Sequence, residues 1–260
     1  MLYAVISLIF GLIVGSFLNV VINRLKLKES LGGRSHCPHC KKELKAIHLV
    51  PLLSFVWLGG KCAYCKKPIS PQYALVEGGT ALTFAFVQMQ FGFFTPDTVF
   101  LWVITAMLIV IGVYDFKHFI IPDKIVFPGI AVALLYVLYK DFSAGCMVSW
   151  DCATVSGLVG VAIIAGFFLS QYIVSQGRWI GFGDVKLGIM LGLVAGFIDS
   201  LVLLMIAYMS GAFVGIILIG LGKKSYSSKM PFGTFLVAAG IITAIWGSHI
   251  ANWYITLLGF

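Results

Sequence analysis

Apolar blocks recur along nearly the whole chain, and no other feature of the sequence constrains the fold as strongly. Most blocks have about 17 to 25 residues, the length of helix that crosses a hydrocarbon core of about 30 Å. Hydrophobic residues make up 60% of the chain and charged residues only 11%, whereas about a quarter is typical of soluble domains. The sequence predicts an all-α integral membrane protein with about eight transmembrane helices, at approximately 3–22, 73–94, 98–114, 125–139, 153–174, 184–198, 201–221 and 232–258.

The distribution of Lys and Arg predicts the orientation, because basic residues in short loops stay on the cytoplasmic side. Ten of the 18 basic residues lie between Arg24 and Lys67. No basic region precedes the block at 3–22 and no small-x-small site follows it, so we expect it to remain as a mature helix. Eight spans then place both termini outside the cytoplasm, with Lys140 and four aspartates in the outer loops. The cytoplasmic side also receives Lys117, Lys124, Arg178, Lys223, Lys224 and Lys229.

The formal net charge of +8 is explained by this orientation and by attraction to anionic lipids of the inner leaflet. A nucleic-acid-binding protein needs a folded basic surface that reaches the nucleic acid. We therefore expect membrane lipids as partners and no nucleic acid.

Residues 24–72, between the first and second blocks, form the longest polar stretch of the chain. A segment of this size rarely has enough core to fold without a metal or disulfides. It contains two CxxC motifs 21 residues apart, and four thiolates at such spacing suit tetrahedral, structural zinc. The alternatives are two disulfides, which a reducing cytoplasm disfavours, or four inert thiols. The predicted ligands are Cys37, Cys40, Cys62 and Cys65.

A second pair of cysteines, Cys146 and Cys152, falls in a predicted outer loop. From the sequence, a disulfide and two free thiols are equally good interpretations.

Two aspartates lie at the predicted cytoplasmic ends of helices, where a charge is costly. Asp115 follows an apolar run, and Asp184 stands in the motif Gly181-Phe-Gly-Asp184 before another. Two neighbouring carboxylates, one ionised and one protonated, can activate a water and polarise a peptide carbonyl. We expect the glycines to leave room for an extended substrate backbone. Asp115 and Asp184 could thus act together as the catalytic carboxylates of a peptidase.

The alternative is that these aspartates cap helices or pair with Lys117 and Lys186. Asp123, after Pro122, is typical of a helix N-cap or first turn. Glu77 lies inside the apolar start of the second block and should face a polar site, because lipid does not tolerate its charge.

Taken in order, these motifs resemble those of bacterial type IV prepilin peptidases over nearly the whole chain. The matching segments are Gly11-Leu-Ile-Val-Gly-Ser-Phe-Leu-Asn-Val-Val-Ile-Asn-Arg24, the paired CxxC motifs, Ile69-Ser-Pro-Gln-Tyr-Ala-Leu-Val-Glu77, the Asp115 segment ending Ile121-Pro-Asp123, and Gly181-Phe-Gly-Asp-Val-Lys-Leu187.

The resemblance implies a bifunctional enzyme of the inner membrane. It would cleave the basic leader from type IV prepilins or pseudopilins on the cytoplasmic face and then N-methylate the new amino terminus with S-adenosylmethionine. Asp115 and Asp184 fall on the two catalytic aspartates of the family, and the four cysteines on its cytoplasmic cysteine segment. For methylation the candidates are Gly60 and Glu77, which match the family pattern. Glu77 would orient the substrate amine or bind the sulfonium donor; the alternative is a carboxylate held by hydrogen bonds within the helix bundle. No Rossmann-type glycine motif marks a donor site.

Three functional regions follow from the resemblance: a first helix at 1–23, a zinc-containing, methylation-associated segment at 24–72 and a protease core at 73–260. The chain departs from the usual family pattern at Gly78-Gly79-Thr80 and at Thr234, where a second proline is common. We expect neither departure to touch the aspartates.

Two other functional classes use intramembrane carboxylates. Presenilin-like proteases share the Gly-x-Gly-Asp motif, but the cysteine-rich insertion argues against them. A proton- or cation-coupled transporter would use Asp115, Asp184 and Glu77 as relays. Internal repeats would favour a transporter, and we find no convincing inverted repeat.

Overall fold

The computed structural model of the chain describes residues 2–27, 29–146, 149–223 and 230–257. All the named elements of the described residues are helices, which confirms the predicted fold class, and two isolated β-bridges flank the CxxC motifs. The elements in chain order are α1 (Leu2–Leu27), the 3₁₀ helix η1 (Ala46–Leu49), α2 (Leu53–Trp57), α3 (Gln72–Phe91), α4 (Pro96–His118), α5 (Asp123–Ala144), α6 (Ala153–Ser175), α7 (Phe182–Gly220) and α8 (Phe232–Leu257). Lys224 and Lys229, used in predicting the orientation, lie outside the described residues.

Six helices among the described residues are long and apolar enough to cross a membrane, namely α1, α4, α5, α6, α7 and α8. This count differs from the eight predicted blocks for two reasons. α7 contains two of the blocks, joined across a kink at Gly196 whose backbone is not helical (φ 71°, ψ −163°). α3, which carries Glu77 and three glutamines, is not among the six.

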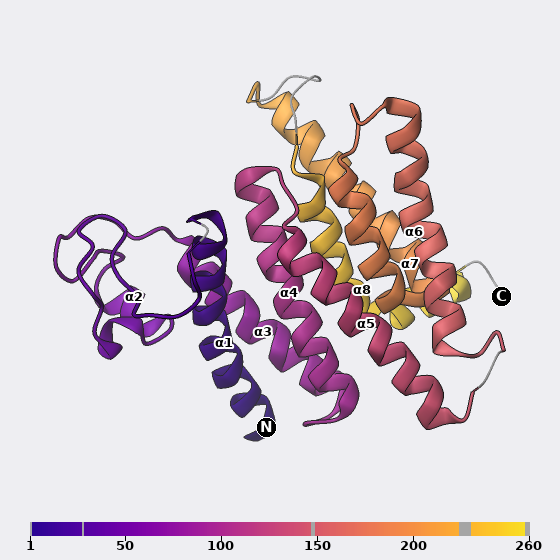
Figure 1. Cartoon of the computed structure of the whole chain (residues 1–260), viewed down its shortest axis with the longest axis horizontal. Coiled ribbons are helices and arrows are strands. Elements are labelled where there is room, and N and C mark those ends of the chain that lie inside the picture. The colour runs from indigo at the N-terminus through magenta and orange to yellow at the C-terminus, as the bar shows by residue number, and fades with distance from the viewer. Residues whose placement is uncertain (1, 28, 147–148, 224–229, 258–260) are drawn as a thin grey trace. The chain divides into compact units, whose positions relative to one another are not determined.

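The described chain divides into two compact units, residues 1–110 and 111–260. In the first unit α1 lies alongside α3, and the cysteine-rich insertion that connects them stands beside this pair (Figure 1). Glycines allow the close approach: a Cβ at Gly11 would lie 2.6 Å from the Cα of Ala81, and one at Gly15 would lie 2.7 Å from the Cα of Glu77. Small residues serve membrane helices in this way because van der Waals packing drives their association.

In the second unit α7 packs against both α6 and α8, and α5 completes the group (Figure 1). Gly160 of α6 faces the kink, and a Cβ there would lie 2.7 Å from the carbonyl oxygen of Gly196. The kink frees the backbone N–H of Phe197, which donates to Ser156 Oγ on α6 at 3.0 Å. A side chain of the neighbouring helix thus accepts the backbone N–H that the kink leaves without a helical partner. Such pairing is needed because unpaired backbone groups are costly inside a membrane.

α5 contains Pro128 and still extends over 22 residues, so the proline predicted to be tolerated within a bundle lies inside a regular helix. Its predicted block, 125–139, was therefore too short.

Candidate active site and cysteine cluster

Asp115 and Asp184 lie in the same unit, near the end of α4 and in the first turn of α7. Both side chains are buried, with relative exposures of 5% and 8%. They are close enough to interact electrostatically. The structure therefore brings together the two carboxylates that the sequence predicts as a pair.

Asp115 is held by Thr234, at the start of α8. The backbone N–H of Thr234 donates to Asp115 Oδ2 at 2.9 Å, and its hydroxyl lies 3.2 Å from the same oxygen and 3.2 Å from the carbonyl oxygen of Gly112. The expectation that the departure at Thr234 leaves the aspartates untouched is wrong. Thr234 is separated from Asp115 by 119 residues of chain, and only helix packing puts the two in contact.

Asp184 has a different environment. Its Oδ1 is buried and has no hydrogen-bond partner in the part of the chain that the structure describes. Lys186, its partner in the alternative interpretation, instead forms an ion pair with Asp123, with Nζ 2.8 Å from Oδ1. Asp123 is the first residue of α5, which agrees with a first-turn position. One oxygen of Asp184 is thus left for a substrate or water.

Two glycines shape the packing around this pair. A Cβ at Gly233 would lie 2.9 Å from Asp115 Oδ2 and 3.1 Å from Cδ1 of Ile121, and one at Gly183 would lie 3.0 Å from Cβ of Ile121. We expected the glycines beside Asp184 to leave room for substrate, but Gly183 leaves room for Ile121. Buried Ile121 therefore lies against both glycines, one at the start of α7 beside Asp184 and one at the start of α8 beside Asp115.

The four cysteines of the insertion converge on one point, with all four sulfur atoms within 4.8 Å of one another. None of them forms a disulfide. The Cys37 and Cys65 sulfurs are 3.9 Å apart, close to the roughly 3.8 Å expected for two thiolates bound tetrahedrally at about 2.3 Å from zinc. The cluster fits a Cys₄ zinc site, and His36 and His39 are not part of it.

The two CxxC motifs have the same backbone geometry. In each, the first cysteine's N–H donates to the residue five positions later, at 3.0 Å for Cys37 and 2.9 Å for Cys62. Lys41 and Lys66, which follow the second cysteines, both have a φ of 58°. The two CxxC motifs therefore form the same turn, and each turn contributes two sulfur atoms to the cluster.

The pKa values of two of these thiols are shifted in opposite directions. Hydrogen bonds from the backbone amides of Cys65 and Tyr64 lower the pKa of Cys62 to about 6. The Lys67 amide lowers the pKa of Cys65, but burial and the neighbouring thiols outweigh it and raise that pKa to about 11. Four adjacent thiolates need a cation to offset their repulsion, as zinc does.

Glu77 is buried at the α1–α3 contact and joins the insertion to α3. The backbone N–H of Leu52, just before α2, donates to Glu77 Oε2 at 2.8 Å. Leu52 has a φ of 57°, which is rare for a leucine and marks a locally strained backbone. Gly60 also has a positive φ, 66°, but its nearest side chain is Phe55 rather than Glu77.

Polar residues that sequence reasoning passed over surround the same end of α1 and α3. Asn19 donates to the Tyr73 carbonyl oxygen at 3.1 Å and accepts from Gln72 at 3.2 Å, while Asn23 donates to the Tyr73 hydroxyl at 2.9 Å. Two asparagines four residues apart, one inside the first apolar block and one directly after it, were the available signal.

Cys146 and Cys152 form a disulfide in the segment between α5 and α6. Asp141 stands beside it and accepts from the N–H groups of Ala153 and Thr154 at 2.6 and 2.9 Å, so it caps α6. The structure thus favours the disulfide over two free thiols.

Comparison with known proteins agrees with this arrangement. The model of the bacterial Peptidase A24 N-terminal domain matches residues 9–91, and that of the type IV leader peptidase family matches residues 102–216. A prepilin leader peptidase/N-methyltransferase of Aeromonas hydrophila is 32% identical, with 98% of this chain and 94% of that protein aligned. Proteins of the same name from Pseudomonas aeruginosa and Legionella pneumophila are 30% and 32% identical, again over nearly the full length. No solved structure matches the chain.

Proposed function

Because this chain belongs to the type IV leader peptidase family, we propose that it is a membrane aspartyl endopeptidase that removes the leader from type IV prepilins or pseudopilins and then N-methylates the new amino terminus. The observation that carries the peptidase proposal is the pair of buried, interacting carboxylates of Asp115 and Asp184.

The surroundings of the two aspartates suggest a division of roles. Two donors from Thr234 stabilise the ionised form of Asp115, which makes it the base that takes a proton from the attacking water. Asp184, with a buried unpartnered oxygen, supplies the protonated carboxyl that donates to the scissile carbonyl. As the water oxygen bonds to the carbonyl carbon, one water proton moves to Asp115 and the proton of Asp184 moves to the carbonyl oxygen, which gives a tetrahedral diol. Asp115 then protonates the amide nitrogen, the C–N bond breaks and the amine leaves, while one hydroxyl of the diol returns its proton to Asp184 and becomes the new carbonyl.

The test is cleavage of a prepilin by the purified full-length protein. Asp115→Asn and Asp184→Asn should each abolish cleavage, because either change removes one of the two proton-transfer groups. Asp123→Asn is the matched control, since Asp123 forms a surface ion pair and should leave cleavage near the wild-type rate. If either dyad variant cleaves at near the wild-type rate while folded, these catalytic roles are wrong.

For methylation we propose Glu77, with Gly60 in the adjoining insertion. S-adenosylmethionine would supply an electrophilic methyl group on a cationic sulfonium. A buried carboxylate with one strong donor from Leu52 suits either that cation or the amine of the cleaved product. Glu77→Gln should give cleaved but unmethylated product by mass spectrometry, while wild-type protein gives methylated product only when the donor is added. Methylated product from Glu77→Gln at the wild-type level would remove Glu77 from this role.

We further propose that Cys37, Cys40, Cys62 and Cys65 bind structural zinc and that this insertion faces the cytoplasm, with both termini outside. The disulfide between α5 and α6 supports this orientation, because disulfides persist on the oxidising side of the inner membrane. We also propose three functional regions: the first helix at 1–23, the zinc-containing segment at 24–72 and the protease core at 73–260. Their boundaries differ from those of the two compact units, of which the first contains Glu77 and the four cysteines and the second contains both aspartates. The transporter alternative is not supported, since the relatives are peptidases by name.

A further inference from the structure

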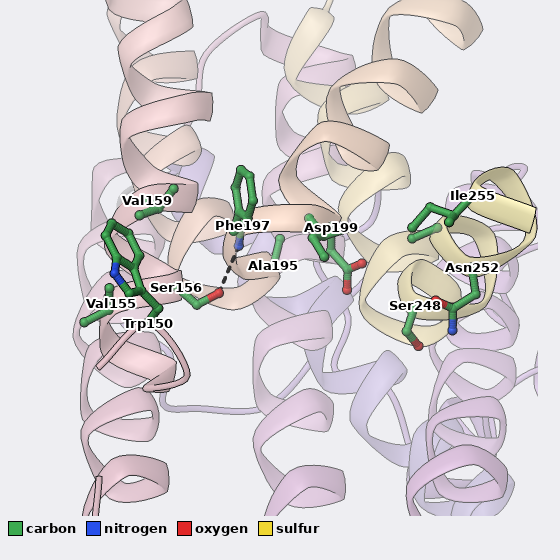
Figure 2. A pocket seen from close by; sticks show the side chains of 12 residues that line it. Trp150, Val155, Ser156, Val159, Ala195, Phe197, Asp199, Ser248, Asn252 and Ile255 are labelled. Carbon is green, nitrogen blue, oxygen red and sulfur yellow. Dashed lines mark hydrogen bonds between the residues drawn. The ribbon is translucent and has the colours of Figure 1, made fainter. Parts of the chain in front are cut away.

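A cavity of about 600 Å³ lies in the second unit, away from both aspartates. Its walls come from the start of α6, the α7 kink and the last turns of α8 (Figure 2). Cavities of this size suit small molecules or lipid headgroups. The opening is bordered by Trp150, which is 84% exposed, and tryptophan is enriched where membrane meets water.

The cavity contains a carboxylate for which the peptidase mechanism has no use. Asp199 follows the kink by three residues, and it has no ion pair or hydrogen bond within the described ranges 2–27, 29–146, 149–223 and 230–257. The structure makes room for it, because a Cβ at Gly247 on α8 would lie 2.7 Å from the Asp199 carboxyl carbon. An ionisable group in a membrane helix is a functional-site candidate unless something pairs with it.

Neutral hydrogen-bonding groups stand opposite this carboxylate. Figure 2 shows Asp199 pointing toward the wall formed by Ser248 and Asn252 of α8. Their hydroxyl and amide groups can donate to an anionic oxygen, whereas a carboxylate can only accept. The remaining walls are apolar apart from Ser156, whose Oγ accepts the N–H of Phe197, and Phe197 and Ile198 are each about half exposed.

From this arrangement we propose that the cavity binds the zwitterionic headgroup of an ethanolamine phospholipid. The primary ammonium donates to Asp199, and the phosphate accepts from Ser248 and Asn252. The upper acyl chains lie against Phe197 and Ile198. A quaternary choline headgroup has no N–H to give Asp199, and a glycerol headgroup has no positive charge.

The experiment measures binding of short-chain phosphatidylethanolamine, phosphatidylcholine and phosphatidylglycerol to the full-length protein in detergent by native mass spectrometry. Wild-type protein should bind the ethanolamine lipid about tenfold more tightly than the other two, the effect of one charge-assisted hydrogen bond. Asp199→Asn should remove this preference. Asp151→Asn removes an exposed aspartate that does not line the cavity and should keep it.

Equal binding of the three lipids to wild-type protein would overturn the proposal, and this comparison needs no variant to fold. A preference that survives in Asp199→Asn would also overturn it. Soluble phosphoethanolamine offers the same headgroup without chains and should not compete; full competition would contradict a lipid as the ligand. Prepilin cleavage, measured in parallel, should be unchanged in Asp199→Asn, so failure here leaves the peptidase proposal standing.

Discussion

The packing around Gly233 predicts how closely cleavage depends on the position of Asp115. In Gly233→Ala the new Cβ would stand 2.9 Å from Asp115 Oδ2 and 3.0 Å from its Cγ, where unstrained contacts begin near 3.4 Å. Ile121 blocks the Cβ on another side at 3.1 Å, so the carboxylate must move by about half an ångström. A displacement of about 1 Å can cost 10²-fold in rate. We therefore expect kcat/KM for cleavage to fall about tenfold.

The assay is cleavage of a prepilin by purified protein, with thermal unfolding measured on the same samples. Gly166→Ala is the matched control, because a Cβ at Gly166 on α6 meets nothing within 4 Å and alanine favours a helix by about 0.5–1 kcal/mol. The control should cleave normally and be slightly more stable. Normal cleavage by folded Gly233→Ala would refute the argument that the glycine sets the position of Asp115.

Three further predictions follow from the site and its surroundings. Thr234→Val should lower cleavage about threefold, because it removes the hydroxyl donor but keeps the N–H, and Thr234→Ser should restore it; a larger loss in Thr234→Ser than in Thr234→Val would contradict this. Cys37→Ser should lower zinc from about one per chain to near zero by metal analysis, and a full zinc content would reject the Cys₄ site. In intact cells, Cys146 and Cys152 should react with an impermeant thiol reagent only after an impermeant reductant, whereas labelling without reduction would reject the disulfide.

Local patterns in the sequence predicted the features that depend on neighbouring residues. Apolar block length predicted the helices, because a membrane requires each segment to satisfy its own backbone. The CxxC spacing predicted the sulfur cluster, since each pair sits in one tight turn. The number of spans was harder: a single glycine, Gly196, decides whether two blocks form one continuous element, and sequence alone does not show its backbone angles.

Contacts between distant segments could not be read in this way. Thr234 was singled out as unusual, yet its two donors to Asp115 depend on how α8 packs against the end of α4. The bond from Leu52 to Glu77 depends on a positive φ at a leucine, which no propensity would suggest. The alternative that Lys186 pairs with Asp184, two residues before it, is not what the structure has, because Lys186 pairs with Asp123 on α5.

The kink in α7 also sets the depth of Asp184. The first half of α7, 182–195, rises only about 21 Å, less than a hydrocarbon core of about 30 Å. Gly188 packs against Ala165, so α6, which runs on to Ser175, extends about 9 Å beyond the level of Asp184. A membrane accommodates so short a helix by local thinning of the bilayer, among other ways. We therefore expect the peptide bond to be cut to enter a recess below the end of α6, where local thinning would bring hydrolytic water closer to Asp184.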